Sequence, residues 1–337
     1  MRAMVLTAPG ELVLDDVARP VANAREVLVR VTHSGICGTD YKIFNGSIPV
    51  RYPRIMGHEM VGEVVEAADA PFRPGDRVIV DPELYCGACF HCRVGQTHLC
   101  PNGSLLGRDA NGGFADYLVA PATQVFPLPE TIDRRASPMI QVLTTCLHAQ
   151  RRIDIFPGEH VVVLGLGVTG QLHVQLARAR GATVIGVTRS AEKRRLAETL
   201  GASVTFAGDD RAVQNIRDAT GGRGADVVIE TTGVVPQLAS AVHMARSGGR
   251  ILMFGIITAQ EGALPFYDLY YKELALINAR VAKGEDYPGA IDLVERGHVR
   301  LEPLISDVMP LGELRTAIGM LGADGGGQRM KIVLEHV

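Results

Sequence analysis

The first 135 residues carry short apolar runs that are separated by turn residues. Residues 27–31 and 76–80 are two such runs, rich in β-branched side chains, and Pro74-Gly75 leads into the second. Apolar runs of this length, bounded by proline and glycine, are typical of strands. Because no long stretch before residue 135 repeats at helical spacing, the pattern predicts an irregular, β-rich domain.

From residue 157 onward, continuous apolar runs alternate with stretches that have a helical period. The run His-Val-Val-Val-Leu at residues 160–164 lacks polar alternation, which is typical of a strand covered on both faces. Glycines follow several helical stretches, where a left-handed cap favours them. The alternation predicts an α/β class with a doubly wound parallel sheet. The further runs are residues 182–187, 225–229, 250–254 and 274–277, and the capping glycines are Gly181, Gly201 and the pair Gly248-Gly249.

Beyond residue 284 the pattern predicts a helix at residues 287–296, a short helix at 311–321 and a final strand at 331–335. A chain of 337 residues is long enough for about two domains of roughly 150 residues each. We expect the tail to return to the first domain. Residues 1–144 and 285–337 would then form one domain, and residues 145–284 the other.

Composition excludes several classes of function. Lys and Arg number 34 against 37 Asp and Glu, and no basic patch appears, so nucleic acid is not an expected partner. Apolar residues make up 47% of the chain, which excludes extensive disorder. No apolar run approaches the ~20 residues that span a bilayer, and the N-terminus lacks a signal-peptide core. We therefore expect a cytoplasmic protein with no membrane partner.

Four of the six cysteines lie within one turn-rich loop. Four thiolates at this spacing can close a tetrahedron around Zn²⁺ and leave no open position, which predicts a structural zinc site. An iron–sulfur cluster is the competing interpretation, because four thiolates also suit it. We expect His91 and His98, which lie between the cysteines, to be solvated loop residues. The four cysteines are Cys86, Cys89, Cys92 and Cys100.

A second group of metal-binding residue types lies nearer the N-terminus. Cys37 stands in Cys-Gly-Thr-Asp, and His58 and Glu59 stand in Gly-His-Glu. A thiolate, an imidazole and a carboxylate form a mixed ligand set with room for water or a substrate. Each segment alone is weak evidence, since a lone cysteine is usually a small core residue and a lone His-Glu pair usually lies on a surface.

A glycine-rich turn follows the run at residues 160–164. It reads Gly165-Leu-Gly167-Val-Thr169-Gly170 and leads into a helical stretch. In this strand–turn–helix context the pattern predicts a dinucleotide-binding turn, because the glycines let a pyrophosphate approach the helix N-terminus.

The end of the next predicted strand indicates which dinucleotide is bound. Enzymes that use NAD place an acidic residue there to hold the ribose 2′-hydroxyl, whereas this chain has Thr188, Arg189 and Ser190, followed by Lys193. Hydroxyl donors and a guanidinium suit a 2′-phosphate. The pattern predicts NADP in preference to NAD, with NAD still possible. The competing interpretation is that Arg189 points to solvent and the selectivity is weak.

These motifs occur in an order that resembles the zinc-dependent medium-chain alcohol dehydrogenases. The resemblance is closest to the sorbitol/polyol and threonine dehydrogenase branch, and it covers nearly the whole chain. It implies a GroES-like catalytic domain, a Rossmann cofactor domain, and two Zn²⁺ per chain, one catalytic and one structural. It also implies that Cys37 and His58 bind the catalytic zinc. Glu59 would either bind this zinc directly or lie just outside its ligands. Thr39 would hydrogen-bond the substrate oxygen and start a proton relay.

The resemblance further implies the reaction and the assembly. The reaction would be hydride transfer between a secondary alcohol and a nicotinamide cofactor. The assembly would be a homotetramer or homodimer joined through edge strands of the cofactor domains. The chain departs from the family pattern at two positions: Ala68 replaces a usual glycine, and Gln141 stands where a Glu or Cys is usual. Gln141 is either a further zinc ligand or a hydrogen-bond partner of a metal-bound water.

The substrate class is the least defined part of the hypothesis. Tyr41, Gln141 and Arg280 are polar residues that would suit a substrate with several hydroxyl groups, such as a polyol or sugar, although Arg280 could equally lie on a surface. We expect His148 and Cys146 to be packed core residues. Two alternative functions are a zinc-independent quinone or enoyl reductase of the same superfamily, and a non-catalytic NADPH-binding protein.

Overall fold

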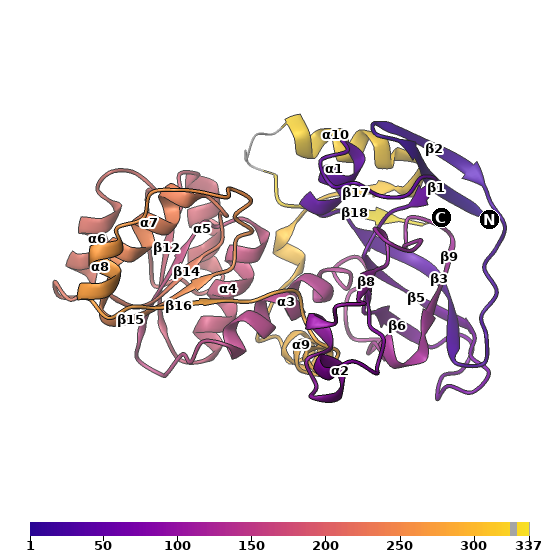
Figure 1. Cartoon of the computed structure of the whole chain (residues 1–337), viewed down its shortest axis with the longest axis horizontal. Helices are drawn as coiled ribbons and strands as arrows, with labels where there is room; N and C mark the ends of the chain where they lie inside the picture. The colour runs from indigo at the N-terminus through magenta and orange to yellow at the C-terminus, as the bar shows by residue number, and fades with distance from the viewer. Residues whose placement is uncertain (324–328, 337) are drawn as a thin grey trace. The chain divides into compact units, whose positions relative to one another are not determined.

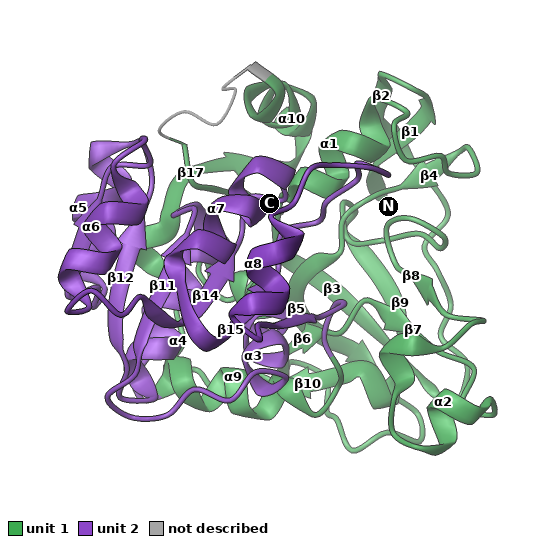
Figure 2. Cartoon of the chain, turned by 60° about the vertical axis from the view of Figure 1, so that its left-hand side comes forward, with its two compact units in different colours: residues 1–142, 283–295, 301–337 green, residues 143–282, 296–300 purple. Residues whose placement is uncertain are grey.

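The computed structural model describes residues 1–323 and 329–336 (Figure 1). The chain forms two compact units (Figure 2). Unit 2 is made of Leu143–Ala282 and Arg296–Arg300, while unit 1 takes Met1–Val142, Lys283–Glu295 and Leu301–Val337. The segments that follow unit 2 in the sequence thus belong to the same unit as the N-terminal segment.

Unit 1 is built around a seven-stranded sheet whose central strand is β3 (Glu26–Gly35). β3 pairs antiparallel with β5 (Glu59–Glu66), β9 (Tyr117–Pro121) and β18 (Lys331–Glu335). β18 in turn pairs with β17 (Ile305–Pro310), so strands from both ends of the chain meet in one sheet. The other strands of unit 1 are β1 (Arg2–Ala8), β2 (Glu11–Asp16), β4 (Arg54–Ile55), β6 (Arg77–Val80), β7 (Glu83–Leu84), β8 (Ser104–Leu105) and β10 (Val125–Pro127).

Few helices accompany these strands, as the sequence predicted for the first 135 residues. α1 (Gly38–Phe44) and α10 (Leu314–Ala323) pack together with β1 in one apolar cluster that contains Leu6, Ile43 and Ile318. The helix predicted at residues 311–321 begins as a 3-10 turn at Leu311–Glu313. The remaining helices of this unit are α2 (Phe90–Arg93) and α9 (Asp286–Glu295), and α3 (Met139–Arg151) begins in unit 1 and continues into unit 2.

Unit 2 is a six-stranded, fully parallel sheet in the order β13-β12-β11-β14-β15-β16. The order reverses at β11, which gives a doubly wound sheet with a topological switch point between β11 and β14. The strands are β11 (His160–Leu164), β12 (Thr183–Val187), β13 (Val204–Phe206), β14 (Ala225–Glu230), β15 (Ala245–Met253) and β16 (Ala275–Asn278). The helices are α4 (Val168–Ala179), α5 (Ala191–Thr199), α6 (Ala212–Ala219), α7 (Val235–Met244) and α8 (Phe266–Tyr271).

Both faces of this sheet are buried, which explains why β11 lacks polar alternation. Val161 and Val163 pack in one apolar cluster with Val174 of α4. Val162 and Leu164 pack in a second cluster, on the side of α6 and α7. Because successive side chains of a strand point to opposite faces, a strand between two helical layers is expected to be apolar at consecutive positions.

One prediction about capping was wrong. Gly181 and Gly201 do adopt positive φ just after helices α4 and α5, but Gly248 and Gly249 lie inside β15. Helix α7 ends instead at Met244, and its C-cap Ala245 already has an extended backbone. The glycine pair accompanies a register shift between β14 and β15. Within the described part of the chain, no helix has the length and apolar character that crossing a membrane requires.

The approach of β5 to β3 provides a test of the packing in unit 1. A Cβ at Gly62 would lie 2.1 Å from the carbonyl oxygen of Arg30, a backbone atom that cannot move aside. We expect Gly62→Ala to lower the free energy of unfolding by about 2 kcal/mol. Gly319→Ala in α10 is the matched control, because no atom lies within 4 Å of its Cβ, and alanine there should raise stability by up to about 1 kcal/mol. Urea unfolding of both variants measures the difference, and equal effects would contradict the packing.

Candidate functional site

Cys37, His58 and Glu59 converge in unit 1, with one ligand atom from each lying within 4.8 Å of the others. Cys37 is the N-cap of α1, and the other two stand where β5 begins. Their chain segments are adjacent because β5 pairs with β3, the strand that leads into α1. The donor set is one thiolate, one imidazole and one carboxylate, which suits zinc in a site that keeps an open position.

Asp40 orients the imidazole of His58. Its side chain is fully buried, and one carboxylate oxygen lies 3.3 Å from His58 Nδ1 while the other accepts a hydrogen bond of 2.8 Å from the amide of Cys37. Burial acts to lower the pKa of His58, but the charge and hydrogen bond of Asp40 raise it well above its usual value. Because Asp40 occupies the Nδ1 side, Nε2 is the ring nitrogen available to a ligand.

The carboxylate of Glu59 is held by Lys331 of β18. Lys331 Nζ lies 2.7 Å from Oε1 and 2.6 Å from Oε2, and it also donates to the carbonyl of Ile36 at 3.0 Å. Both side chains are buried, at 4% and 0% exposure. A Cβ at Gly35 would lie 2.1 Å from Glu59 Oε2, so only glycine leaves room for the carboxylate at that point.

The turn before His58 is held by a neighbouring segment. The amide of Gly113 donates to the carbonyl of Gly57 at 3.0 Å, and the amide of Phe114 donates to that of Met56 at 2.9 Å. Gly57 has a φ of +93°, and a Cβ there would lie 2.6 Å from the ring of Phe114. His58 therefore follows a backbone turn that only glycine can form in this packing.

The other residues predicted for this site lie on separate elements. Thr39 is in the first turn of α1, directly after Gly38, and Gln141 is the third residue of α3. The ring of Tyr41 packs against Gly322 of α10. Arg280 belongs to unit 2 and is exposed.

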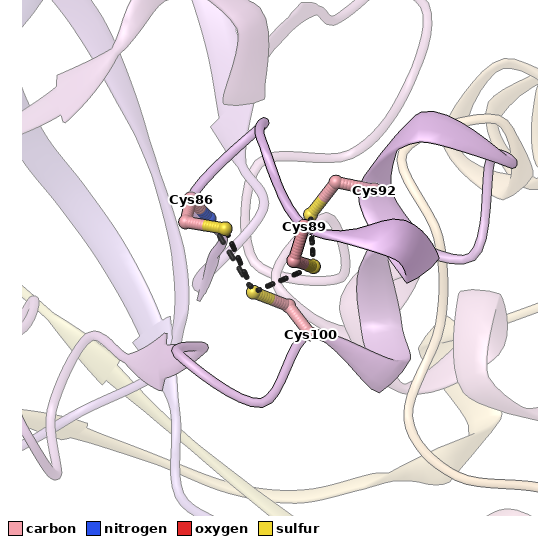
Figure 3. A group of neighbouring side chains, drawn as sticks. All are labelled: Cys86, Cys89, Cys92 and Cys100. Atoms are coloured by element: carbon pink, nitrogen blue, oxygen red, sulfur yellow. Dashed lines mark hydrogen bonds between the residues drawn. The ribbon is translucent and has the colours of Figure 1, made fainter.

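The four cysteines of the loop also converge (Figure 3). Sγ of Cys100 lies 3.5 Å from that of Cys86 and 3.8 Å from that of Cys89, and Cys89 and Cys92 are 3.5 Å apart. Backbone amides of Ala88 and Cys89 lower the pKa of the Cys86 thiol to about 6. Four sulfur atoms at these separations fit a tetrahedral zinc ion that binds four thiolates.

The two histidines of this loop differ from each other. His91 lies 3.2 Å from the side-chain oxygen of Gln96, at the surface of the loop. His98 is buried in the short 3-10 helix before Cys100, so the prediction that it would be solvated was wrong. Its helix closes the cysteine loop, which places its ring inside rather than in water.

The three glycines of the nucleotide-binding turn have different surroundings. A Cβ at Gly165 would lie 2.6 Å from Thr231 Oγ1, and one at Gly170 would lie 2.0 Å from the carbonyl oxygen of Gly165. Gly167, the N-cap of α4, has open space around it. The outer glycines thus permit close packing of strand and helix, and the middle one leaves the α4 N-terminus accessible, with Thr169 in its first turn.

The segment after β12 is basic. Ser190 is the N-cap of α5; its hydroxyl accepts from the amide of Lys193 at 3.3 Å and donates to the carboxylate of Glu192 at 3.0 Å. Arg189 is exposed, and Thr188 is partly buried at the strand end. A cavity of about 320 Å³ adjoins this edge of the sheet and is lined by Leu164, Val187, Gly208, Asp209, Ser240 and neighbouring residues.

Sequence reasoning did not identify Asp40 and Lys331. Asp40 stands three residues after Cys37, at the helical spacing that brings a side chain back to its own N-cap, and this signal was available. Lys331 offered none, because it is separated from Glu59 by 272 positions.

Known proteins resemble this chain over nearly its whole length. The family model "Alcohol dehydrogenase GroES-like domain" matches residues 23–130, and "Zinc-binding dehydrogenase" matches residues 168–296. A 2-dehydro-3-deoxy-L-galactonate 5-dehydrogenase of Pseudoalteromonas atlantica is 34% identical over 93% of this chain and 92% of its own. A sorbitol dehydrogenase of Halalkalibacterium halodurans is 30% identical over 100% of both chains. A zinc-binding dehydrogenase structure from Sinorhizobium meliloti, bound to NADP, aligns with a TM-score of 0.92 at 34% identity, covering 99% of this chain and 98% of that one.

The pairing of Lys331 with Glu59 leads to a stability prediction. Lys331→Met leaves a buried carboxylate without its cation, and we expect a loss of about 3 to 5 kcal/mol in the free energy of unfolding. The double variant Lys331→Met, Glu59→Gln should recover part of that loss, since the uncompensated charge is gone. Denaturant unfolding at matched zinc content makes the comparison. A single variant as stable as the parent would show that the pair does not hold the carboxylate.

Proposed function

The chain belongs to the zinc-binding alcohol dehydrogenase family, and on that premise we propose that it moves a hydride between a secondary alcohol and NADP. The convergence of Cys37, His58 and Glu59 in unit 1 carries this proposal. Unit 2 supplies the glycine-rich turn at its switch point. One unit thus offers an open metal site, and the other offers a dinucleotide site.

We assign the catalytic zinc to Cys37, His58 and Glu59, with Gln141 as a further candidate ligand, and the structural zinc to the four cysteines of the loop. The donor sets and their separations support both assignments. When bound at the first site, zinc acts as a Lewis acid that lowers the pKa of an alcohol.

The chain's own residues prepare this site for an alcohol. Asp40 fixes the tautomer and plane of His58, and Lys331 fixes the carboxylate of Glu59. In this scheme Thr39, in the first turn of the helix that Cys37 caps, would accept the hydrogen bond of the substrate hydroxyl and relay the proton, passing its own hydroxyl proton to the cofactor ribose as it takes the one from the substrate. A buried, pre-oriented set of groups needs little reorganisation during proton transfer.

The substrate in this proposal is a polyol, sugar or sugar acid. Relatives that are about 30% identical or more over nearly the whole chain are named for sorbitol and galactonate oxidation. Gln141 and Arg280 are the candidate contacts for additional hydroxyl groups, and Tyr41 is a third candidate whose ring already packs on α10. A substrate with several hydroxyl groups can form hydrogen bonds with polar side chains of these types.

NADP is the proposed cofactor, with Thr188, Arg189, Ser190 and Lys193 around its 2′-phosphate. No acidic residue stands at the strand end itself. The structure neighbour from Sinorhizobium meliloti, at 34% identity, was solved bound to NADP. NAD remains the second cofactor to test.

The first test combines metal counting with turnover. We expect two zinc ions per chain by elemental analysis, and reduction of NADP⁺ in the presence of pooled polyols, aldoses and sugar acids. Cys37→Ser should bind one zinc and lose at least about 10³-fold in kcat/KM, because the catalytic metal is gone. Cys146→Ala is the matched control, since Cys146 is a buried cysteine of α3 that belongs to neither group of candidate ligands, and it should retain both zinc ions and the activity.

The alternatives give different outcomes. A zinc-independent quinone or enoyl reductase would keep its activity in Cys37→Ser. A non-catalytic NADPH-binding protein would bind a single zinc ion and would oxidise no substrate in any of the pools. Two zinc ions with no turnover of any pool would contradict the proposed substrate class.

We also propose that the chain assembles as a homodimer or homotetramer through β16. This strand ends the sheet of unit 2, pairs only with β15 among the described strands, and exposes Leu276. Helix α8 is exposed as well, with aromatic side chains that include Tyr267 and Tyr270. An open edge strand of this kind requires a cover, since it otherwise invites aggregation.

Light scattering tests the assembly. Leu276→Glu should shift the mass toward the monomer of 36.1 kDa, because a charge in an apolar interface is not compensated. Val21→Glu is the matched control, as Val21 is an exposed valine of unit 1, and it should leave the mass unchanged. A mass unaffected by Leu276→Glu would place the interface elsewhere.

A further inference from the structure

A second arginine is held at the end of β12 by the backbone itself. Arg194 of α5 donates from Nη1 to the carbonyl oxygens of Thr188 and Arg189, both at 2.9 Å. These carbonyls lie at the carboxyl end of a parallel strand, the edge where doubly wound sheets bind their ligands. Two hydrogen bonds from one nitrogen therefore fix the guanidinium beside the proposed nucleotide site.

The remaining donors of this guanidinium are free. Among the residues that the structure describes, none accepts a hydrogen bond from Nε or Nη2 of Arg194. Arg194 is partly buried, whereas the next residue, Arg195, is exposed and pairs with Glu192 at 3.6 Å. A planar guanidinium that is oriented on one side and free on the other is suited to bind a phosphate.

Most of the charged groups near the strand end are basic. Arg189, Lys193 and Arg194 stand within six positions on the α5 side. The hydroxyl of Ser190 already donates to Glu192, so the arginines are the stronger remaining donors. The nearby carboxylate of Glu192 is already occupied by Ser190 and Arg195, while Asp209 lines the adjoining cavity. The free N–H groups of the arginines therefore favour a dianionic group beside them.

We propose that Arg194 is a specificity-determining residue that selects the 2′-phosphate of NADP. It braces the backbone of Thr188 and Arg189 through Nη1 and offers its free N–H groups to the phosphate, which it shares with Arg189. This inference rests on the proposed use of NADP. It concerns binding alone and involves no change in the chemistry at the metal centre.

The test measures binding of two adenosine nucleotides to the full, zinc-loaded chain by calorimetry. Adenosine 2′,5′-bisphosphate and adenosine 5′-monophosphate differ only in the 2′-phosphate, and neither requires turnover. We expect Arg194→Leu to weaken the bisphosphate by at least about tenfold, which is the scale of a charge-assisted hydrogen bond, and to change the monophosphate by less than about twofold. Arg195→Leu, the matched control, should change neither, and Arg194→Lys should give an intermediate loss because it keeps the charge without the fork.

The outcomes separate this inference from the proposed cofactor. If the parent chain binds both nucleotides equally, the assignment of NADP is wrong. If Arg189→Asp removes the preference while Arg194→Leu keeps it, NADP stands and the role of Arg194 is wrong. Equal weakening of both nucleotides by Arg194→Leu would also overturn the inference, since the arginine would then only support the turn.

Discussion

The candidate catalytic centre depends on keeping several charged groups out of water. Asp40 and Glu59 are fully buried, and a buried carboxylate is stable only with a close cation or with hydrogen bonds to both oxygens. Asp40 satisfies this condition through His58 and the amide of Cys37, and Glu59 satisfies it through Lys331. The same contacts that compensate the charges also fix the direction of each side chain. One set of interactions thus stabilises the unit and fixes the geometry of the site.

Much of unit 2 could be predicted because its physical requirements are local. A strand between two layers of helices is apolar along most of its length, and the run at β11 shows this directly. The run at β16 is apolar as well, although this edge strand is largely exposed. The glycine-rich turn is also local, since its strand, turn and helix are consecutive. The error at Gly248 and Gly249 arose because a glycine pair suits both a helix cap and an irregular strand, and only the pairing of β15 with β14 distinguishes them.

Unit 1 and its site were harder to predict because their contacts are long-range. Short strands exist through pairing with distant partners, and no period in the sequence reveals that β18 lies beside β3. The candidate zinc ligands were recognisable by residue type and spacing. Lys331 was not recognisable, since a lysine side chain usually lies at the protein surface. The sequence also does not show how little volume is available around a residue. Gly35 and Gly57 have the sequence context of ordinary turn residues, and only the structure shows that Glu59 and Phe114 occupy the volume next to them. His98 shows the same limit, as its burial depends on how the cysteine loop closes.

The order of strands in unit 1 has a consequence for biosynthesis. Nearly all of unit 2 emerges from the ribosome before β17 and β18, yet β18 lies between β3 and β17 in the sheet that the N-terminal strands begin. The sheet around β3 therefore stays incomplete during most of translation, with its own edge exposed, while the later segment can already fold as a unit. Lys331 follows Glu59 by 272 positions and reaches it only when β18 joins the sheet. The nascent protein must hold the carboxylate of Glu59 without this cation until then, so the buried ion pair of the candidate site forms after unit 2 has been synthesised.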